Sequence, residues 1–261
     1  MAQHINNLAK SRLAAGELSI GMGVKAMRSV EIARIMKTAG YDWLFIDLEH
    51  GPTSVETAYA ISVAALDAGI APIVRVPHGE LALATRCLDG GALGIVIPHV
   101  DTAAEARDMV QAFRYAPLGK RSIAGGYPQF GFAPTPASEV VAEMNQATLV
   151  IAMVETPLAI ENADEIAAVP GVDILLMGIN DLCLEMGIPG QIDDDRVVAA
   201  VQKVVTACKR HGKWPGIGGV YGKALLKRYI DMGMQFILSG NDLPLLMAAA
   251  TEHAAFVRGC A

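Results

Sequence analysis

The sequence predicts a (β/α)8 barrel, and three features carry this prediction. The chain has 261 residues, close to the ~250 residues typical of one such barrel. Eight short apolar segments alternate with segments that have the period of amphipathic helices, as repeated βα units require. The apolar segments have few polar interruptions, which is typical of parallel strands buried on both faces. We therefore expect residues 1–261 to form a single barrel domain, with a doubly wound sheet as the alternative fold.

The expected strands share an apolar run that is bounded by Gly, Pro or Asp. They cover residues 18–23, 43–48, 72–76, 93–98, 149–154, 173–178, 215–219 and 235–239. Parallel strands of a barrel end at the same rim, and side chains just beyond their C-terminal ends form the active sites of such barrels. Polar residues at these positions are therefore the candidates for function.

Between the strands, helical periodicity predicts helices over residues 30–39, 55–68, 103–114, 159–168, 194–211 and 223–232. Several of these segments end at a glycine, such as Gly69 and Gly212, which is a common C-terminal signal. Ser54 precedes the second helix as a candidate N-cap. Residues 115–138 are rich in Pro and Gly but contain the aromatic residues Tyr127, Phe130 and Phe132, so we expect a long ordered loop there.

Composition excludes several classes of protein. The net charge of −6 and the absence of a Lys/Arg stripe argue against nucleic acid as a partner. No uncharged run approaches the ~20 residues that span a bilayer, and the N-terminal residues lack a signal-peptide core. The four cysteines form no C-x-x-C motif. We therefore expect reduced thiols in a cytoplasmic protein without a membrane segment.

Two carboxylates follow consecutive predicted strands. Glu155 comes directly after residues 149–154, and Asp181 lies shortly after residues 173–178. In a barrel they would lie side by side at one rim, where oxygen ligands suit Mg²⁺ or Mn²⁺. The alternative is that both acidic residues only cap the helices that follow. Position alone leaves these two interpretations open.

His50 and Arg75 also lie at strand ends. His50 follows the acidic pair Asp47 and Glu49 and is a candidate general base, although a packed surface histidine would fit the same pattern. Arg75 interrupts an apolar strand, so its guanidinium must meet either a structural carboxylate or an anionic ligand. Asp89 precedes the fourth strand and either lies in an exposed turn or orients a histidine.

The segment that leads from the sixth strand into the next helix offers backbone N–H groups to an anion. Gly178 and Asn180 lie in this segment, where a carboxylate or phosphate could bind. The sequence contains no glycine-rich nucleotide-binding fingerprint. No lysine ends a predicted strand, so Schiff-base chemistry has no obvious candidate, and Lys25 after the first strand is the nearest.

Taken together, several motifs resemble the signature of the HpcH/HpaI aldolases, which are metal-dependent class II pyruvate aldolases. They occur in order along the chain at residues 42–51 (DWLFIDLEHG), 74–77 (VRVP), 94–98 (GIVIP), 114–122 (RYAPLGKRS), 153–156 (MVET) and 178–182 (GINDL). Two positions depart from the pattern of many members. Met153 stands where glutamine is common, and a tryptophan found after the first strand in some members is absent.

This resemblance implies roles for individual residues. Glu155 and Asp181 match the two protein ligands of a divalent cation, which would be Mg²⁺, Mn²⁺ or Co²⁺. His50 matches the catalytic base and Asp89 its carboxylate partner. Arg75 matches the arginine that binds the 2-oxo oxygen of the substrate. The backbone at Gly178 and Asn180 matches the segment that holds the pyruvate carboxylate. Asp47 matches an acidic residue close to the site.

The resemblance further implies an aldolase that converts 4-hydroxy-2-oxo acids to pyruvate, or a close 2-oxo acid, and an aldehyde. It implies small-molecule substrates and a homohexamer, a trimer of dimers, in which the last helix is exchanged between subunits. Two other functions remain as alternatives. One is a CoA-ester lyase of the citrate lyase β type, and the other is a non-catalytic barrel that binds a 2-oxo acid.

Overall fold

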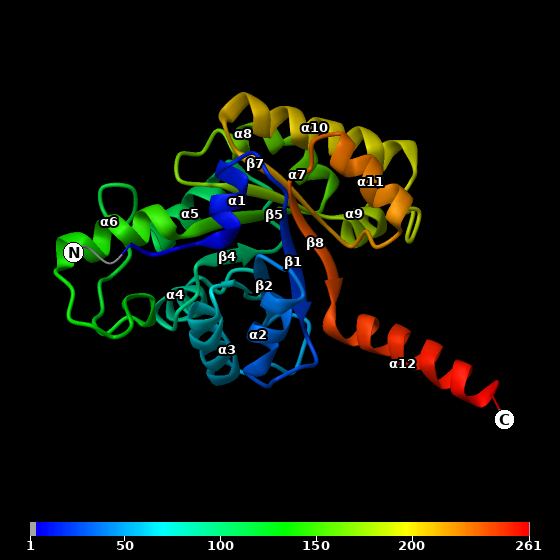
Figure 1. Cartoon of the computed structure of the whole chain (residues 1–261). Helices are drawn as coiled ribbons and strands as arrows, with labels where there is room; N and C mark the ends of the chain where they lie inside the picture. Colours follow the sequence, from blue (N-terminus) through cyan, green and yellow to red (C-terminus); the bar gives the residue numbers. More distant parts are fainter. Residues whose placement is uncertain (1–3, 261) are drawn as a thin grey trace.

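The computed structural model describes residues 4–260 and has at its centre a closed barrel of eight parallel strands (Figure 1). The strands follow one another around the barrel in chain order. They are β1 (Ser19–Val24), β2 (Trp43–Asp47), β3 (Ala71–Arg75), β4 (Gly94–Ile97), β5 (Leu149–Val154), β6 (Ile174–Gly178), β7 (Trp214–Gly218) and β8 (Phe236–Asn241). The (β/α)8 fold is thereby confirmed, and each strand starts and ends within two residues of its predicted limits.

Helices surround this barrel on the outside (Figure 1). They are α1 (Leu8–Ala14), α2 (Glu31–Thr38), α3 (Val55–Ala68), α4 (Leu81–Asp89), α5 (Ala103–Phe113), α6 (Ala137–Ala147), α7 (Pro157–Glu161), α8 (Ala163–Ala167), α9 (Ile179–Glu185), α10 (Asp195–His211), α11 (Lys223–Asp231) and α12 (Asp242–Arg258). The helix predicted over 159–168 is divided into α7 and α8 at Asn162. Helices α1, α4, α6 and α12 were not predicted.

Local capping explains where several helices begin and end. The Ser54 side chain accepts a hydrogen bond from the backbone N–H of Thr57 and so starts α3, as expected. Gly69 and Gly212 end α3 and α10 in the left-handed conformation, with φ of 70° and 63°, which glycine adopts without steric cost. The loop over 115–136 contains only the short 3₁₀ turn η1 (Pro128–Phe130).

The barrel interior is filled by large side chains that point inward from the strands. Trp43 stacks on Phe236 with ring centroids 3.9 Å apart, and a Cβ atom at Gly21 would collide with the Trp43 ring. Because inward positions alternate along a strand, Phe45 and Asp47 follow Trp43 on the inner face. Apolar packing thus fills the barrel below its carboxyl end, where inward side chains become polar.

The two ends of the barrel differ. The amino-terminal end is covered by α1, α6 and the loop over 115–136, and the Asn7 side chain there donates to the carbonyls of Leu93 and Ala147, at 3.0 and 2.8 Å. The carboxyl end is where the polar inward side chains and the loops that follow the strands lie. This is the end at which the site residues were expected.

Helix α12 runs away from the barrel (Figure 1). Among its residues only Asp242 is buried, whereas several large apolar side chains are exposed, namely Leu243, Leu245, Leu246, Met247, Phe256 and Val257. Across residues 4–260, no helix combines the length and the apolarity that crossing a membrane requires.

Candidate active site

A cavity of about 260 Å³ opens at the carboxyl end of the barrel. Its lining comes from most of the strands and the loops that follow them: Lys25, Phe45, His50, Arg75, Met153, Gly178, Ile179, Asn180, Asp181, Gly218, Gly219, Tyr221, Leu238 and Asn241. An apolar concave pocket with a few convergent polar groups at this end of a barrel is the usual form of an active site. The sequence placed His50, Arg75, Gly178, Asn180 and Asp181 here, and the structure brings all five together.

Arg75 is held in this cavity by Asp47. The two residues are partners in the register between β2 and β3, and both side chains point inward. Nε and Nη2 of Arg75 donate to the two oxygens of Asp47, at 3.0 and 2.6 Å, in the bidentate geometry that fixes a guanidinium plane. Burial by itself would raise the pKa of Asp47, but the hydrogen bonds and the charge of Arg75 outweigh burial and keep this pKa below its ordinary value.

The remaining contacts of Arg75 fix the direction of its third nitrogen. Nη1 lies 3.0 Å from Oε2 of Glu49 and 3.9 Å from the sulfur of Met153. The guanidinium carbon lies 5.1 Å from the centre of the Phe45 ring. Arg75 is therefore a preorganised cation at the cavity, and Asp47 acts on the site by positioning it. The family resemblance had predicted that Asp47 lies close to the site, but nothing in the sequence had indicated its pairing with Arg75.

Glu155 follows β5 and is almost fully buried, with 1% of its side chain exposed. Oε1 accepts a hydrogen bond from the backbone N–H of His99 at 2.9 Å, whereas Oε2 has no hydrogen-bond partner among residues 4–260. Burial, with the charge of Asp181 as a smaller contribution, raises the pKa of Glu155 to about 7. A Cβ atom at Gly178 would collide with Oε2, so glycine is needed for the carboxylate to reach this place.

These features fit a divalent cation. A buried carboxylate oxygen without a donor is costly unless something positive meets it. Asp181, in the first turn of α9, lines the cavity and interacts electrostatically with the buried Glu155. Within the described residues there is no cluster of three or more His, Cys, Asp or Glu with metal-binding geometry. Two carboxylates suit an ion such as Mg²⁺, which takes few protein ligands and leaves other positions to water and substrate.

His50 reaches the cavity from the loop after β2, and 58% of its side chain is exposed. Its backbone N–H donates to Oδ1 of Asp47 at 3.2 Å, which holds the loop in place. Nε2 lies 3.6 Å from Oε2 of Glu49. Among residues 4–260, Glu49 is the carboxylate that the structure places beside the imidazole.

Asp89 is not brought to the cavity within this chain. It ends α4, a helix that carries the chain from the carboxyl end of β3 back to the amino end of β4. Its carboxylate pairs there with Arg121 at 2.7 Å, and Arg121 in turn lies over the ring of Tyr115. The sequence could not show this location because the helix over residues 81–89 had not been predicted.

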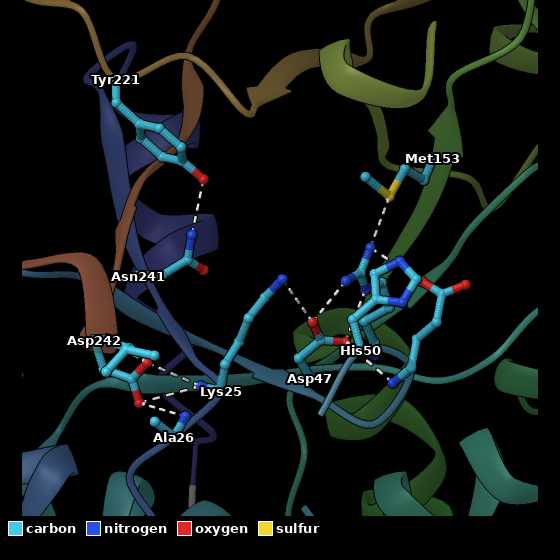
Figure 2. A network of polar contacts seen from close by, with 11 residues as sticks. Lys25, Ala26, Asp47, His50, Met153, Tyr221, Asn241 and Asp242 are labelled. Atoms are coloured by element: carbon cyan, nitrogen blue, oxygen red, sulfur yellow. Dashed lines mark hydrogen bonds and ion pairs between the residues drawn. The ribbon is translucent and has the colours of Figure 1, made fainter. Parts of the chain in front are cut away.

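Three polar or charged side chains line the cavity without having been predicted as site residues, namely those of Lys25, Tyr221 and Asn241. Nζ of Lys25 lies 3.3 Å from Oδ2 of Asp47, and Nδ2 of Asn241 donates to the Tyr221 hydroxyl oxygen at 2.8 Å (Figure 2). Asp242 holds the turn after β1 by accepting the backbone N–H groups of Lys25, Ala26 and Met27. Lys25 directly follows β1, and Asn241 is the last residue of β8. Their positions at strand ends are the signal that could have identified them from the sequence.

His99 adds backbone strain beside Glu155. Its φ of 51° is rare for a non-glycine residue, and strain of this kind concentrates at functional sites. The imidazole Nδ1 lies 3.6 Å from Oε1 of Glu155. His99 was not among the residues predicted for the site.

Comparison with known proteins identifies relatives over nearly the whole chain. A model of the family described as HpcH/HpaI aldolase/citrate lyase matches residues 25–249. A 4-hydroxy-4-methyl-2-oxoglutarate aldolase of Chaetomium globosum is 40% identical over 98% of this chain and 96% of its own length. A hydroxypyruvate/pyruvate aldolase of Roseovarius nubinhibens is 34% identical over 94% of this chain and 95% of its own length.

The fold comparison agrees with these matches. The crystal structure of an HpcH/HpaI aldolase from Desulfitobacterium hafniense superposes with a TM-score of 0.91 at 30% sequence identity. The superposition covers 97% of each chain. The cavity and its charged residues therefore lie in a barrel that known aldolases share.

Proposed function

Because this chain belongs to the HpcH/HpaI aldolase/citrate lyase family, we propose that it is an aldolase that cleaves 4-hydroxy-2-oxo acids. The products are pyruvate, or a close 2-oxo acid such as hydroxypyruvate, and a second carbonyl compound. The relatives that are named as aldolases of such acids support this substrate class. In cleavage the C3–C4 bond breaks, and its electron pair moves into the enolate of the 2-oxo acid.

Glu155 and Asp181 would hold a divalent cation, which is Mg²⁺, Mn²⁺ or Co²⁺. The unpartnered Oε2 of the buried Glu155 and the position of Asp181 on the cavity support this assignment. When bound, such a cation supplies Lewis-acid stabilisation of the negative charge that develops on the 2-oxo oxygen.

Arg75 would donate to that same oxygen and stabilise the enolate. Nε and Nη2 are occupied by Asp47, whereas Nη1, which pairs with Glu49, also lies beside Met153 in the cavity wall. A donor that is already fixed where charge develops costs no reorganisation during the reaction. The backbone at Gly178 and Asn180 would hold the carboxylate of the 2-oxo acid, which is supported by the absence of a side-chain cap at the start of α9.

His50 would act as the base that takes the proton from the 4-hydroxyl group. Its place at the cavity and its solvent-exposed imidazole support this role, since the proton must later leave to water. If Asp89 orients His50, it does so from a neighbouring subunit, because the two residues lie at opposite ends of one barrel. A base of this kind contributes about 10²–10⁴-fold to the rate.

We further propose a homohexamer, a trimer of dimers, in which α12 is exchanged between subunits. The exposed apolar side chains of α12 support an interface along this helix. A cytoplasmic location is supported by the four cysteines, which are all free thiols.

The observation that carries the proposal is the cavity that Asp181, Arg75 and the backbone at Gly178 line together, with the buried carboxylate of Glu155 directly behind Gly178. The test is proton NMR of pyruvate in D₂O with protein that has been stripped by EDTA. We expect the methyl signal to disappear only after Mg²⁺ or Mn²⁺ is added, and faster than with cation and buffer alone. If neither pyruvate nor hydroxypyruvate exchanges with any of the cations, the aldolase proposal is overturned, and the CoA-ester lyase and the 2-oxo acid-binding barrel take its place.

A further inference from the structure

Lys25 brings a second cation into the cavity, and the proposed chemistry at the 2-oxo acid does not use it. The residue directly follows β1, and its Nζ points into the space that Asp47, Tyr221 and Asn241 border (Figure 2). About a third of the side chain, 35%, is exposed. Its backbone N–H is held by Asp242 at 3.2 Å, so the turn that carries Lys25 is fixed.

Asp47 does not account for this lysine. The Asp47 carboxylate already accepts hydrogen bonds from two nitrogens of Arg75 and from the backbone N–H groups of Glu49 and His50. Lys25 is its most distant partner, at 3.3 Å. An ammonium group has three N–H donors, and Asp47 can occupy only one of them here. The other donors are available to a ligand in the cavity.

Tyr221 and Asn241 complete the wall beside Lys25. Asn241 donates to the Tyr221 hydroxyl oxygen at 2.8 Å, which leaves the Tyr221 O–H free to donate in turn. A Cβ atom at Gly23 would collide with the Asn241 side chain, so glycine at this position is what admits the amide. The wall therefore presents an ammonium and a hydroxyl donor to the same cavity, which is a pair suited to a carboxylate.

This wall lies on the side of the cavity that β7, β8 and β1 form. Lys25 follows β1, which lies opposite β5 and Glu155 in the barrel order, and Asn241 ends β8 beside it. Tyr221 lies in the loop after β7, next to the strand β6 that leads to Asp181. Lys25 and Arg75 together balance the charges of Asp47 and Glu49. An additional anion would thus enter a cluster that is neutral overall.

We propose that Lys25, together with Tyr221, binds a carboxylate on the acceptor half of the substrate. This inference rests on the proposed aldolase function and specifies its substrate as a 4-hydroxy-2-oxo dicarboxylic acid. The acceptor is then an aldehyde or ketone that carries a carboxylate, such as a second 2-oxo acid. In the synthetic direction C3 of the enolate bonds to the acceptor carbonyl carbon, and the carbonyl electron pair moves to oxygen, which takes up a proton.

The test compares two acceptors of similar size, glyoxylate with its carboxylate and glycolaldehyde without charge, in condensation with pyruvate. In Lys25→Met the ratio of kcat/KM for glyoxylate to that for glycolaldehyde should fall about 10- to 100-fold, as expected for loss of a hydrogen bond to a charged group. Lys25→Arg should recover most of this ratio because it restores the charge. Lys203→Met on the exposed face of α10 removes the same charge outside the site and should leave the ratio unchanged.

Metal-dependent exchange of the pyruvate methyl protons, measured on the same samples, reports the donor half alone. If the wild-type protein shows no exchange, the proposed function fails and the Lys25 assignment fails with it. If exchange proceeds but Lys25→Met lowers both acceptors equally, Lys25 acts only by positioning Asp47, and the assignment is overturned while the aldolase function stands. An unchanged ratio overturns it in the same way.

Discussion

Two arginine–aspartate pairs lie at opposite ends of this barrel and serve different purposes. Arg75 pairs with Asp47 at the carboxyl end, and Arg114 pairs with Asp173 at the amino end. The two arginine side chains are almost equally buried, with 6% and 3% exposed. Burial and pairing therefore do not separate a site residue from a structural one.

The difference lies in where the remaining nitrogens point. Arg114 also donates to the backbone carbonyls of Gly171 and Asn145, and Asp173 accepts the N–H of Val150 at 2.7 Å. These bonds tie α5, α6 and β5 together, and Arg114 does not line the active-site cavity. The third nitrogen of Arg75, Nη1, also pairs with a carboxylate, Glu49 at 3.0 Å, but it lies beside Met153 at the cavity that Arg75 lines. A buried cation is a candidate for catalysis when part of its hydrogen-bonding capacity faces a cavity.

The sharpest way to test this comparison is to replace each arginine by lysine, which keeps the charge and removes the planar fork. For Arg75→Lys we expect kcat for cleavage of a 4-hydroxy-2-oxo acid to fall about 10²–10³-fold, as when one preorganised donor to a developing oxyanion is lost. Steady-state kinetics of folded protein at saturating cation measure this. A loss of less than about threefold, the scale of a peripheral change, would contradict the assigned role of Arg75.

A second prediction concerns the cost of the buried carboxylate at the carboxyl end. The pKa of Glu155 is about 7 in the folded protein against an ordinary value of 4.5. Below pH 4.5 the group is protonated in both states, whereas above pH 7 only the folded protein carries a buried charge. In cation-free protein, the Glu155 contribution to the free energy of unfolding should therefore fall by about 3 kcal/mol as the pH rises from 4.5 to 7.

Urea unfolding with EDTA at several pH values measures this contribution as the difference between wild type and Glu155→Gln, since glutamine has no proton to lose there. With excess Mn²⁺ the difference should reverse in sign at high pH, because the cation favours the carboxylate. Parallel pH profiles for the two proteins would show that Glu155 is not strained in the absence of a cation.

The same comparison shows which parts of the molecule a sequence can predict. Strand ends and inward alternation depend on local patterns, so the barrel and the positions of Glu155, Asp181, His50 and Arg75 could be predicted. The pairing of Asp47 with Arg75 depends on the register between β2 and β3, which local patterns do not fix. The contacts of Lys25 and Tyr221 depend on the loops after β1 and β7, whose paths no periodicity describes.

Asp89 shows a different limit of sequence-based prediction. The family resemblance implies that Asp89 is the carboxylate partner of His50, but a nine-residue helix, which rises about 1.5 Å per residue, carries Asp89 away from the carboxyl end of its own barrel. A resemblance to a family assigns each residue a role in the assembled oligomer. It does not show whether the residue acts in the site of its own chain or in that of a neighbouring subunit.

The smallest effect that we predict belongs to the amino-terminal end. Arg114→Lys should lower the free energy of unfolding by about 2 kcal/mol, since one ammonium cannot reach Asp173 and both backbone carbonyls, and each unsatisfied buried acceptor costs about 1–3 kcal/mol. Its kcat should stay within about threefold of wild type because Arg114 has no contact with the cavity. Urea unfolding and steady-state kinetics, run beside Arg75→Lys, measure both quantities. A folded Arg114→Lys variant that lost activity as strongly as Arg75→Lys would show that the two ends of the barrel are coupled. The direction of the guanidinium nitrogens that do not contact aspartate would then not distinguish a catalytic arginine from a structural one.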